Sequence, residues 1–375
     1  MKIIVCGDIV NYKNSDGLIC SEEVSSYIRD SDIAIANFEA PVHSNGKSIE
    51  KSGGHHSQVK NTLKGLETHG FDTLCLANNH IMDYGEVGLK ETLEEAKKNN
   101  LKVIGAGLCF DDAYKPLIVE KDGLKIGIIN AGEAQFGALD YYTCSDKSGY
   151  AWINHSKIDS IVKSLKEKCD YIIFNAHCGL ENVSVPQLEW RLRYKQLCDI
   201  GVDVLIGTHP HVPQGYEKYN DSIIFYSLGN FYFDSKNFED KTDNSYSVVI
   251  HLGKEKFSYE FLYHSKSLNS NKVVIDKEKA KVNIEGLNAQ LTDNYEARNL
   301  KISQDIFNTY IKRNTIYSYS KFFYDGNLLS SIKRFIKSIL GKSENKENLA
   351  LHLLRNESYY YAAKTVLNYQ YRRKG

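Results

Sequence analysis

The chain has 375 residues, of which 25% are charged and 42% are hydrophobic. These proportions are typical of a soluble globular protein and exclude a chain that is disordered throughout. Basic and acidic residues number 47 each, but residues 301–375 contain 14 of the basic and 5 of the acidic ones, so a basic tail follows an acidic body. No apolar run reaches the ~18 residues that a membrane span needs and no signal-peptide pattern opens the chain, so we expect a cytoplasmic protein.

Short apolar runs rich in β-branched residues alternate with longer helical patterns over the first 250 residues. The runs show little polar alternation, which is typical of strands that are buried on both faces. This order predicts an α/β architecture. The predicted strands are Ile3–Cys6, Ile33–Asn37, Thr73–Leu76, Lys102–Ile104, Leu124–Asn130, Tyr171–Ala176, Val202–Gly207, Ile223–Ser227 and Tyr246–Leu252. The predicted helices cover residues 21–30, 58–69, 86–99, 155–168 and 186–200.

The sequence changes in character after about residue 265. Weak strand patterns occur at Lys272–Ile275 and Ala280–Ile284, and from about residue 303 the pattern is helical and rich in tyrosine. Within residues 332–340, apolar residues recur at i, i+3, i+4, i+7 and i+8 with basic residues between them, as in an amphipathic helix. We therefore expect a first domain of residues 1–290 and a basic helical extension of residues 291–375.

Polar residues with metal-binding atoms stand just beyond five of the predicted strands. Open α/β sheets bind ligands at the carboxyl ends of their strands, so these side chains are expected to meet at one edge. Carboxylate, amide and imidazole donors together favour a divalent metal of the Mn, Fe or Zn class over Mg. In chain order the residues are Asp8, Glu39, Asn79, His177, His209 and His211.

Each of these residues also has a simpler explanation. An Asp after a strand is commonly a helix N-cap, an Asn-His pair in a glycine-bounded loop is common in turns, and His177 alone would be typical of a core histidine. The segment His209-Pro210-His211 is more specific, because it puts two imidazoles on one turn. Their joint occurrence at strand ends predicts a site for one or two divalent metal ions per chain.

Six motifs in this chain resemble those of the CapA/PgsA capsule-synthesis family, which is linked to poly-γ-glutamate capsules and belongs to the calcineurin-like metallophosphatase superfamily. The resemblance covers about residues 1–255. It implies a four-layer α/β/β/α sandwich with a metal centre at the strand ends, followed here by the helical C-terminal extension. The motifs are Gly7-Asp8, Asn37-Phe38-Glu39-Ala40-Pro41, Ala77-Asn78-Asn79-His80-Ile81-Met82-Asp83-Tyr84-Gly85, His177-Cys178-Gly179-Leu180-Glu181, Gly207-Thr208-His209-Pro210-His211-Val212-Pro213-Gln214 and Tyr226-Ser227-Leu228-Gly229-Asn230-Phe231.

The resemblance also implies roles for single residues. Glu39 would be the ligand that bridges two metals. His80 would be the general acid beside the leaving group, because imidazole titrates near neutrality. Asp83 would orient His80 or cap the following helix. In the superfamily's reaction a metal-bound hydroxide attacks in line while both ions stabilise the developing charge. The remaining ligands would be Asn79, His177 and His209 at one metal, and Asp8 and His211 at the other.

Three departures from the superfamily pattern bear on the metal site. The first motif is usually Asp-x-His but is Asp8-Ile9-Val10 here, so one metal loses an imidazole. The bridging residue is Glu39, where most of the superfamily has Asp. Cys178 replaces a residue that is usually aromatic, and it is expected to line the pocket rather than to bind metal.

Three further positions lie within or near these motifs. Glu181 is a candidate partner that fixes the tautomer of His177. Asn230 ends a strand and is a candidate hydrogen-bond partner near the metals. His55 and His56 follow two glycines, and we interpret them as part of a solvated loop rather than of a substrate loop.

These residues support more than one function. The first is a metal-dependent hydrolase that cleaves a phosphoester or amide-type bond in a capsule or cell-surface polymer, whose substrate carries phosphate or carboxylate groups. The second is a non-catalytic scaffold of a capsule-assembly complex, which the change at Val10 favours. The third is an intracellular phosphatase of small phosphates.

The basic tail also has alternative roles. Its amphipathic helix fits an anionic membrane surface at the inner face of the membrane, a second subunit, or simple packing on the first domain, which is the more ordinary outcome. Nucleic-acid binding is disfavoured because the charge is modest and the tyrosines follow no known RNA-binding pattern. The sequence does not predict the oligomeric state.

Overall fold

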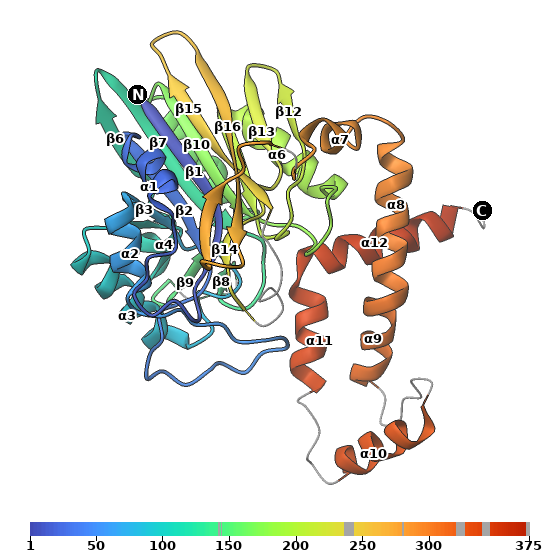
Figure 1. Cartoon of the computed structure of the whole chain (residues 1–375). Helices are drawn as coiled ribbons and strands as arrows, with labels where there is room; N and C mark the ends of the chain where they lie inside the picture. The colour runs from blue at the N-terminus through green and yellow to red at the C-terminus, as the bar shows by residue number, and fades with distance from the viewer. Residues whose placement is uncertain are drawn as a thin grey trace. The chain divides into compact units, whose positions relative to one another are not determined.

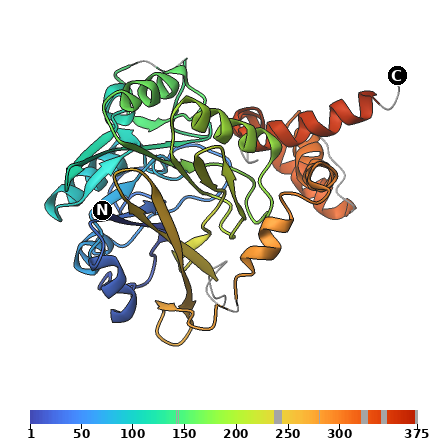
Figure 2. The same cartoon turned by 90° about the horizontal axis from the view of Figure 1, so that it is seen from above.

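A computed structural model describes residues 1–141, 143, 145–235, 244–279, 281–319, 327–339 and 346–372. The chain separates into two compact units. The N-terminal unit consists of Met1–Ile49 and His55–Asp293, and the C-terminal unit consists of Glu50–Gly54 and Asn294–Gly375. Figures 1 and 2 show the ribbon in two orientations.

The N-terminal unit contains the strands and seven of the described helices. The strands are β1 (Lys2–Val10), β2 (Ile33–Phe38), β3 (Thr73–Cys75), β4 (Lys102–Ile104), β5 (Ala106–Gly107), β6 (Leu117–Lys121), β7 (Leu124–Gly132), β8 (Ala138–Leu139), β9 (Gly149–Ala151), β10 (Tyr171–His177), β11 (Val204–Thr208), β12 (Tyr216–Tyr219), β13 (Ser222–Phe225), β14 (Asn230–Phe233), β15 (Ser245–Leu252), β16 (Phe257–Ser267) and β17 (Lys272–Ile275). The helices are α1 (Glu22–Arg29), α2 (Thr62–His69), α3 (Gly85–Lys98), α4 (Phe110–Ala113), α5 (Ser156–Lys166), α6 (Leu188–Ile200) and α7 (Ile284–Ala289).

Two mixed sheets form the centre of this unit. The eight-stranded sheet has the order β17-β16-β15-β1-β2-β3-β4, with β14 also paired to β1, and the six-stranded sheet has the order β12-β13-β11-β10-β7-β6. Within them, β1, β2, β3 and β4 run parallel to one another, as do β7, β10, β11 and β13. A small three-stranded sheet, β5-β9-β8, completes the unit.

The two large sheets are packed face to face with helices on their outer sides. One apolar cluster joins them, with Ile3 and Ile35 from the first sheet and Ile128 and Ile206 from the second. A second cluster covers the outer face of the eight-stranded sheet with residues of α1, α2 and α3. Helices α5 and α6 contact β10 and β11 of the other sheet. The expected four-layer α/β/β/α sandwich is therefore confirmed.

Several predicted elements differ from the structure, and strands β5, β6, β8, β9, β12 and β14 and helix α4 were not predicted. Ala280–Ile284 is not a strand within the described residues, because the Asn283 side chain accepts a 2.9 Å hydrogen bond from the Gly286 backbone and caps α7 instead. The predicted helix at 58–69 begins only at Thr62. Strand β16 was not predicted, since its half-exposed alternating pattern lacks the continuous apolar run used for the other strands.

The C-terminal unit is helical. It consists of α8 (Tyr295–Ile306), a π-helical turn η1 (Phe307–Ile311), α9 (Lys312–Tyr319), α10 (Leu328–Ile339), α11 (Lys346–Arg355) and α12 (Glu357–Arg372). Helix α8 packs on α12 and α9 packs on α11. Its small core buries Ile311, Leu353, Ala362 and Val366. Among the described residues, no helix has both the length and the apolar character to cross a membrane.

Candidate metal centre

Strand register in the eight-stranded sheet brings three polar residues side by side. Strand β1 places Asp8 next to Asn37 of β2 and next to Asn230 of the parallel strand β14. Asn37 Nδ2 donates a 2.7 Å hydrogen bond to Asp8 Oδ1. The approach of β14 requires a glycine before the aspartate, since a Cβ on Gly7 would lie 1.9 Å from the Gly229 carbonyl oxygen.

Register in the six-stranded sheet places a second set at its corresponding edge. His177 at the end of β10 is paired with Gly132 of β7 and Thr208 of β11. The next residue along each neighbouring strand is a candidate donor: Glu133 after β7 and His209 after β11. Carboxyl ends of parallel strands meet at one edge, which is why residues far apart in the sequence converge here.

Glu39 lies where the two sets meet. Its side chain is completely buried, and neither carboxylate oxygen has a hydrogen-bond partner among the described residues. Oε1 is 3.5 Å from His177 Nε2 and 3.6 Å from His211 Nε2. Burial, together with the charge of Asp8, raises the pKa of Glu39. A buried carboxylate whose oxygens accept no hydrogen bond and have only imidazole neighbours is costly, and a divalent cation would lower that cost, so the residues present fit a metal.

The donor atoms form two clusters that share Glu39. Within each cluster the ligand atoms lie within 4.8 Å of one another. Asn79 joins the first cluster, because its Oδ1 is 3.0 Å from His177 Nε2. These groupings are the same two sets that the sequence resemblance implied, and metal binding by them stays a prediction. The first cluster is Glu39, His177 and His209, and the second is Asp8, Glu39 and His211.

The turn that carries His209 and His211 is strained. Both residues have positive φ values, 97° for His209 and 60° for His211, which non-glycine residues rarely adopt. The His209 backbone N–H donates to Asp8 Oδ2 at 3.2 Å, and this bond ties the turn to β1. Such strain persists only where the surrounding structure over-determines it, and it is typical of functional sites. Here it directs two imidazoles of one tight turn into the donor clusters.

The charges of these groups are strongly coupled. Burial alone would raise the pKa of Asp8, but the His211 hydrogen bond and the charges of His177 and His211 hold it below its usual value. Burial alone would lower the pKa of His211, but Glu39 and Asp8 raise it to about 10. His209 is buried and faces two other imidazoles, so its pKa lies well below the usual value. Positively and negatively charged groups are therefore in contact in these clusters. A bound cation would change their protonation, because imidazole and carboxylate ligands bind metal in their deprotonated forms.

His80 and Asp83 form a buried pair, and His80 directly follows Asn79, which contacts His177 of the first cluster. His80 Nδ1 and Asp83 Oδ2 are 2.7 Å apart, and Asp83 has no exposed surface. Of the two roles expected for Asp83, orienting His80 or capping the following helix, this contact supports the first. The carboxylate lies before α3 but no side-chain cap of that helix is formed.

His56 also belongs to this region: it lies in a loop, as interpreted from the sequence, but this part of the loop is half-buried rather than fully solvated. Its ring lies 4.1 Å from the His80 ring, centroid to centroid. Its backbone N–H donates a 2.7 Å hydrogen bond to Asp83 Oδ2, and Tyr12 Oη contacts its Nδ1. The neighbouring His55 turns elsewhere, with Nε2 2.7 Å from the Ile49 carbonyl.

The three other predicted positions have different surroundings. Asn230 Oδ1 is 3.0 Å from His211 Nδ1, so it contacts a candidate ligand directly. Glu181 is exposed, and its carboxylate can group with His209 and His211 as a third donor set. Cys178 is buried and lines a small interior hollow with Tyr194.

Sequence reasoning missed two residues at the centre. Glu133 is buried, lies 3.8 Å from His209 Nε2, and accepts a 3.0 Å hydrogen bond from the Gly179 backbone. Asn37 contacts Asp8 and also places Nδ2 3.2 Å from His177 Nδ1. Glu133 lies just beyond the predicted strand Leu124–Asn130, so the expectation that donors follow strand ends would have found it.

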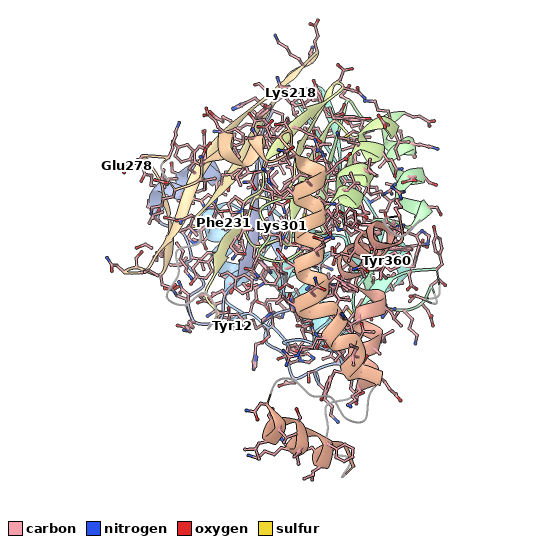
Figure 3. All side chains as sticks on the ribbon, turned by 90° about the vertical axis from the view of Figure 1, so that its right-hand side faces the viewer. Tyr12, Lys218, Phe231, Glu278, Lys301 and Tyr360 are labelled. Atoms are coloured by element: carbon pink, nitrogen blue, oxygen red, sulfur yellow. The ribbon has the colours of Figure 1, made fainter. Side chains whose placement is uncertain are left out.

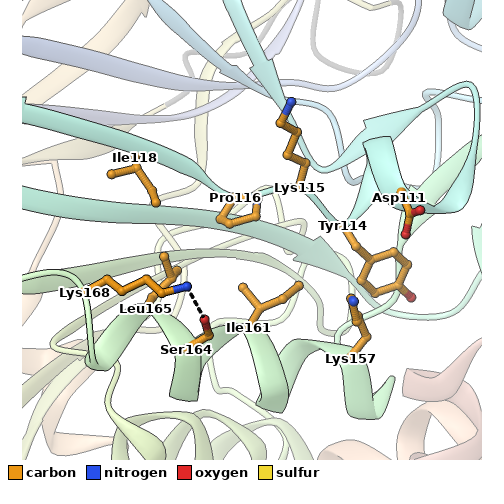
Figure 4. A pocket seen from close by; sticks show the side chains of 10 residues that line it. All are labelled: Asp111, Tyr114, Lys115, Pro116, Ile118, Lys157, Ile161, Ser164, Leu165 and Lys168. Carbon is orange, nitrogen blue, oxygen red and sulfur yellow. Dashed lines mark hydrogen bonds between the residues drawn. The ribbon is translucent and has the colours of Figure 1, made fainter.

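A separate hollow of about 300 Å³ lies between β6 and α5 and includes none of the candidate residues (Figure 4). Its floor is apolar, with Ile161 and Leu165 of α5, and lysines surround it. One of them, Lys168, donates a 3.1 Å hydrogen bond to Ser164 Oγ. This hollow is therefore not part of the candidate metal centre.

Several known proteins are similar to this chain. It is 32% identical over 249 residues to the PGA biosynthesis protein CapA of Bacillus subtilis strain 168, a match that covers 66% of this chain and 64% of the relative. It is also 32% identical over 253 residues to the capsule biosynthesis protein CapA of Bacillus anthracis, covering 65% of this chain and 60% of the relative. The match thus spans less than two thirds of either relative.

Solved structures share lower similarity. The calcineurin-like phosphoesterase YfkN from Bacillus subtilis matches 79% of this chain and 98% of its own, with 14% identity and a TM-score of 0.41. The 5'-nucleotidase precursor from Thermus thermophilus matches 80% of this chain and 59% of its own, with 11% identity and a TM-score of 0.41. Similarity at this level adds nothing to the assignment, which rests on the sequence family. The family described as bacterial capsule synthesis protein PGA_cap matches residues 2–235, more than half of the chain, and the chain therefore belongs to that family.

Proposed function

We propose that this protein is a metal-dependent hydrolase that cleaves a phosphoester or amide-type bond in a capsule or cell-surface polymer, or in a precursor of one. Membership of the capsule synthesis family supports the pathway. The relatives named CapA are described as proteins of PGA and capsule biosynthesis. The activity, the substrate and the partners of this protein are proposed here from that membership and from the site.

One observation carries the hydrolase assignment: two donor clusters share a buried carboxylate without a hydrogen-bond partner, and the residue that follows Asn79 of the first cluster is a histidine that an aspartate orients. Glu39 supplies the carboxylate. His80 and Asp83 supply the second part, with 2.7 Å between their facing atoms. Metal ligands alone would also be found in a structural metal site. Hydrolysis additionally needs a group that gives a proton to the leaving group, and an oriented imidazole is suited to that task.

The chain's own residues have separate tasks in this reaction. A divalent metal held by the two clusters would supply Lewis-acid stabilisation of an anionic oxygen and would activate water. Asp83 holds His80 at Nδ1, so Nε2 on the opposite side of the ring would pass a proton to the leaving group. Asn37 holds Asp8 in place through its 2.7 Å hydrogen bond, as groups behind metal ligands commonly do, and Glu133 lies 3.8 Å from His209 Nε2.

A second function has one specific observation in its favour. Val10 stands where the superfamily's first motif has histidine, and it is fully buried on β1 beside Phe233 of β14. No imidazole from β1 therefore completes the Asp8 cluster. A non-catalytic scaffold whose metal centre has lost activity would have this feature.

Metal content and hydrolysis together distinguish the two functions. The purified protein is incubated with Mn, Zn, Fe or Mg and analysed for bound metal, in parallel with Asp8→Ala. Two equivalents that fall to one in Asp8→Ala would show that Asp8 works without the usual histidine. One equivalent that Asp8→Ala leaves unchanged would mean a single site built on Asn79, His177 and His209.

Hydrolysis is measured with an aryl phosphate and with a γ-glutamyl anilide as probes. We expect His80→Ala to keep its metal and to lose about 10²–10⁴-fold in rate, because it removes only the proton donor. His251→Ala is the matched control, since His251 lies on β15 and is exposed. A metal-loaded protein that cleaves neither probe would contradict the hydrolase proposal and favour the scaffold.

A further inference from the structure

Helix α10 of the C-terminal unit presents an exposed apolar face. Leu328 is 58% exposed, Leu329 73%, Ile332 40% and Ile336 49%, which is unusual for four large apolar side chains on one helix. With 3.6 residues per turn, these four positions fall within an arc of about 100° on the helix. The face is therefore continuous rather than a scatter of single apolar residues.

Basic residues lie within this helix and just beyond it. Between Asp325 and Glu344 the sequence contains four basic residues and no acidic residue. They are Lys333, Arg334, Lys337 and Lys342. Lys333 and Lys337 are exposed, and their helical positions are outside the apolar arc. The result is a cationic helix with an apolar face, in a protein whose formal net charge is zero.

Among the described residues, four other helices of the unit pack in pairs. Helices α8 and α12 pack together, as do α9 and α11. In Figures 1 and 3, α10 stands apart from those four helices. Lys301 of α8 and Tyr360 of α12 mark two of the packed helices in Figure 3.

We propose that α10 binds to the surface of an anionic membrane, with its axis in the plane of the surface. The apolar side chains would enter the boundary between headgroups and acyl chains, while the lysines would extend to the lipid phosphates. Each basic residue near such a surface contributes on the order of 1 kcal/mol, so charge and apolar area act together. This proposal does not depend on the proposed hydrolase function.

The size of the face argues against a second protein chain as its occupant. A helix of 12 residues is about 18 Å long and about 10 Å wide, so its exposed face is roughly 180 Å². A stable interface between proteins buries about 800 Å² on each partner. A lipid surface has no such requirement, because it accepts single amphipathic helices.

The test is co-sedimentation of the full-length protein with vesicles. Neutral phosphatidylcholine vesicles are compared with vesicles that contain about one quarter phosphatidylglycerol. We expect at least ~10-fold tighter binding to the anionic vesicles, and loss of most of that binding at about 0.5 M salt, where charges are screened. Equal binding to both kinds of vesicle, or binding to neither, would overturn the proposal.

Two sets of variants test whether α10 is the element that binds the vesicles. Leu329→Asp combined with Ile336→Asp should reduce binding at least ~10-fold, because it places charges in the apolar face. The matched control is Leu354→Asp on α11, an equally exposed leucine at 71%, which should bind as the unchanged protein does.

A second pair, Lys333→Glu with Lys337→Glu, should abolish the preference for anionic vesicles without changing the apolar face. Unaltered circular dichroism and metal content show that each variant is folded. If the unchanged protein sediments as a dimer and the Leu329→Asp, Ile336→Asp variant as a monomer, the face is occupied by a second copy and the membrane proposal is wrong.

Discussion

At the scale of single residues, Glu39 and His209 distinguish the metal hypothesis from the simpler ones. A helix cap or a core histidine would have its polar atoms satisfied by neighbouring groups. Instead, both Glu39 oxygens and His209 Nδ1 are buried without a hydrogen-bond partner among the described residues. Asp8 is likewise part of a donor cluster and does not cap a helix, since β1 continues through it to Val10.

His209→Ala should remove most of the bound metal from the purified protein, because it deletes one donor of the cluster that Glu39 shares. Elemental analysis measures the loss, and Asn79→Ala should act in the same direction. His251→Ala is the control, as an exposed histidine outside the clusters. Unchanged metal content in His209→Ala would exclude the site as described.

At the scale of elements, strand register determines the geometry of the site. The pairing of Asp8 with Asn37 and Asn230 depends on the shifts in register that occur along β1. A slip of one residue would turn Asp8 to the opposite face of the sheet. The close contact at Gly7 keeps β14 in its register, which explains why a glycine precedes the aspartate.

Strand β16 contains a buried histidine that links stability to pH. His264 is 1% exposed, Ser247 Oγ lies 2.9 Å from its Nε2, and its Nδ1 has no hydrogen-bond partner among the described residues. Burial lowers the pKa of His264 from 6.5 to about 3. Between these values the unfolded chain binds more protons than the folded one, so stability falls as pH falls.

We expect this residue to contribute a loss of about 2 kcal/mol in the free energy of unfolding between about pH 7.5 and about pH 5. Urea unfolding at the two pH values measures the loss. His264→Gln should show a loss smaller by that amount, whereas His251→Gln should behave as the unchanged protein. An equal loss in His264→Gln would mean that other groups cause the pH dependence.

At the scale of the whole molecule, the division into two units raises the question of whether the N-terminal unit folds alone. The division falls between Asp293 and Asn294. Residues just before it still contact the sandwich: Arg191 Nη1 donates a 2.9 Å hydrogen bond to the Leu291 carbonyl. A boundary at residue 290, as expected from the sequence, would remove this contact.

A fragment of residues 1–293 should fold cooperatively and bind as much metal per chain as the full-length protein, because all candidate ligands lie within it. Urea unfolding and elemental analysis are the measurements. A fragment of residues 1–290 should be less stable by about 1–3 kcal/mol, since Arg191 loses its partner. Aggregation of residues 1–293, with no bound metal, would show that the C-terminal unit is part of the main fold.

Much of the sandwich was predictable because its signals are local. Continuous β-branched runs identified β1, β2, β7, β10 and β15, and the candidate donors at the ends of β1, β2 and β10 were named without any structure. Glu133 would also have been found if polar residues beyond the end of β7 had been considered as donors. The incorrect strand at Ala280–Ile284 has a local cause too, the cap formed by Asn283, which the apolar pattern concealed.

The sequence by itself determined the order of the elements and the donor residues at their ends, because both depend on neighbours along the chain. Only the tertiary structure decided which donors meet. Glu39 lies within 3.6 Å of both His177 and His211 because two separate sheets stack face to face. His56 reaches His80 through a loop whose path no periodic pattern encodes. Such contacts depend on pairing between distant segments, and that pairing is decided by the packing of the whole unit.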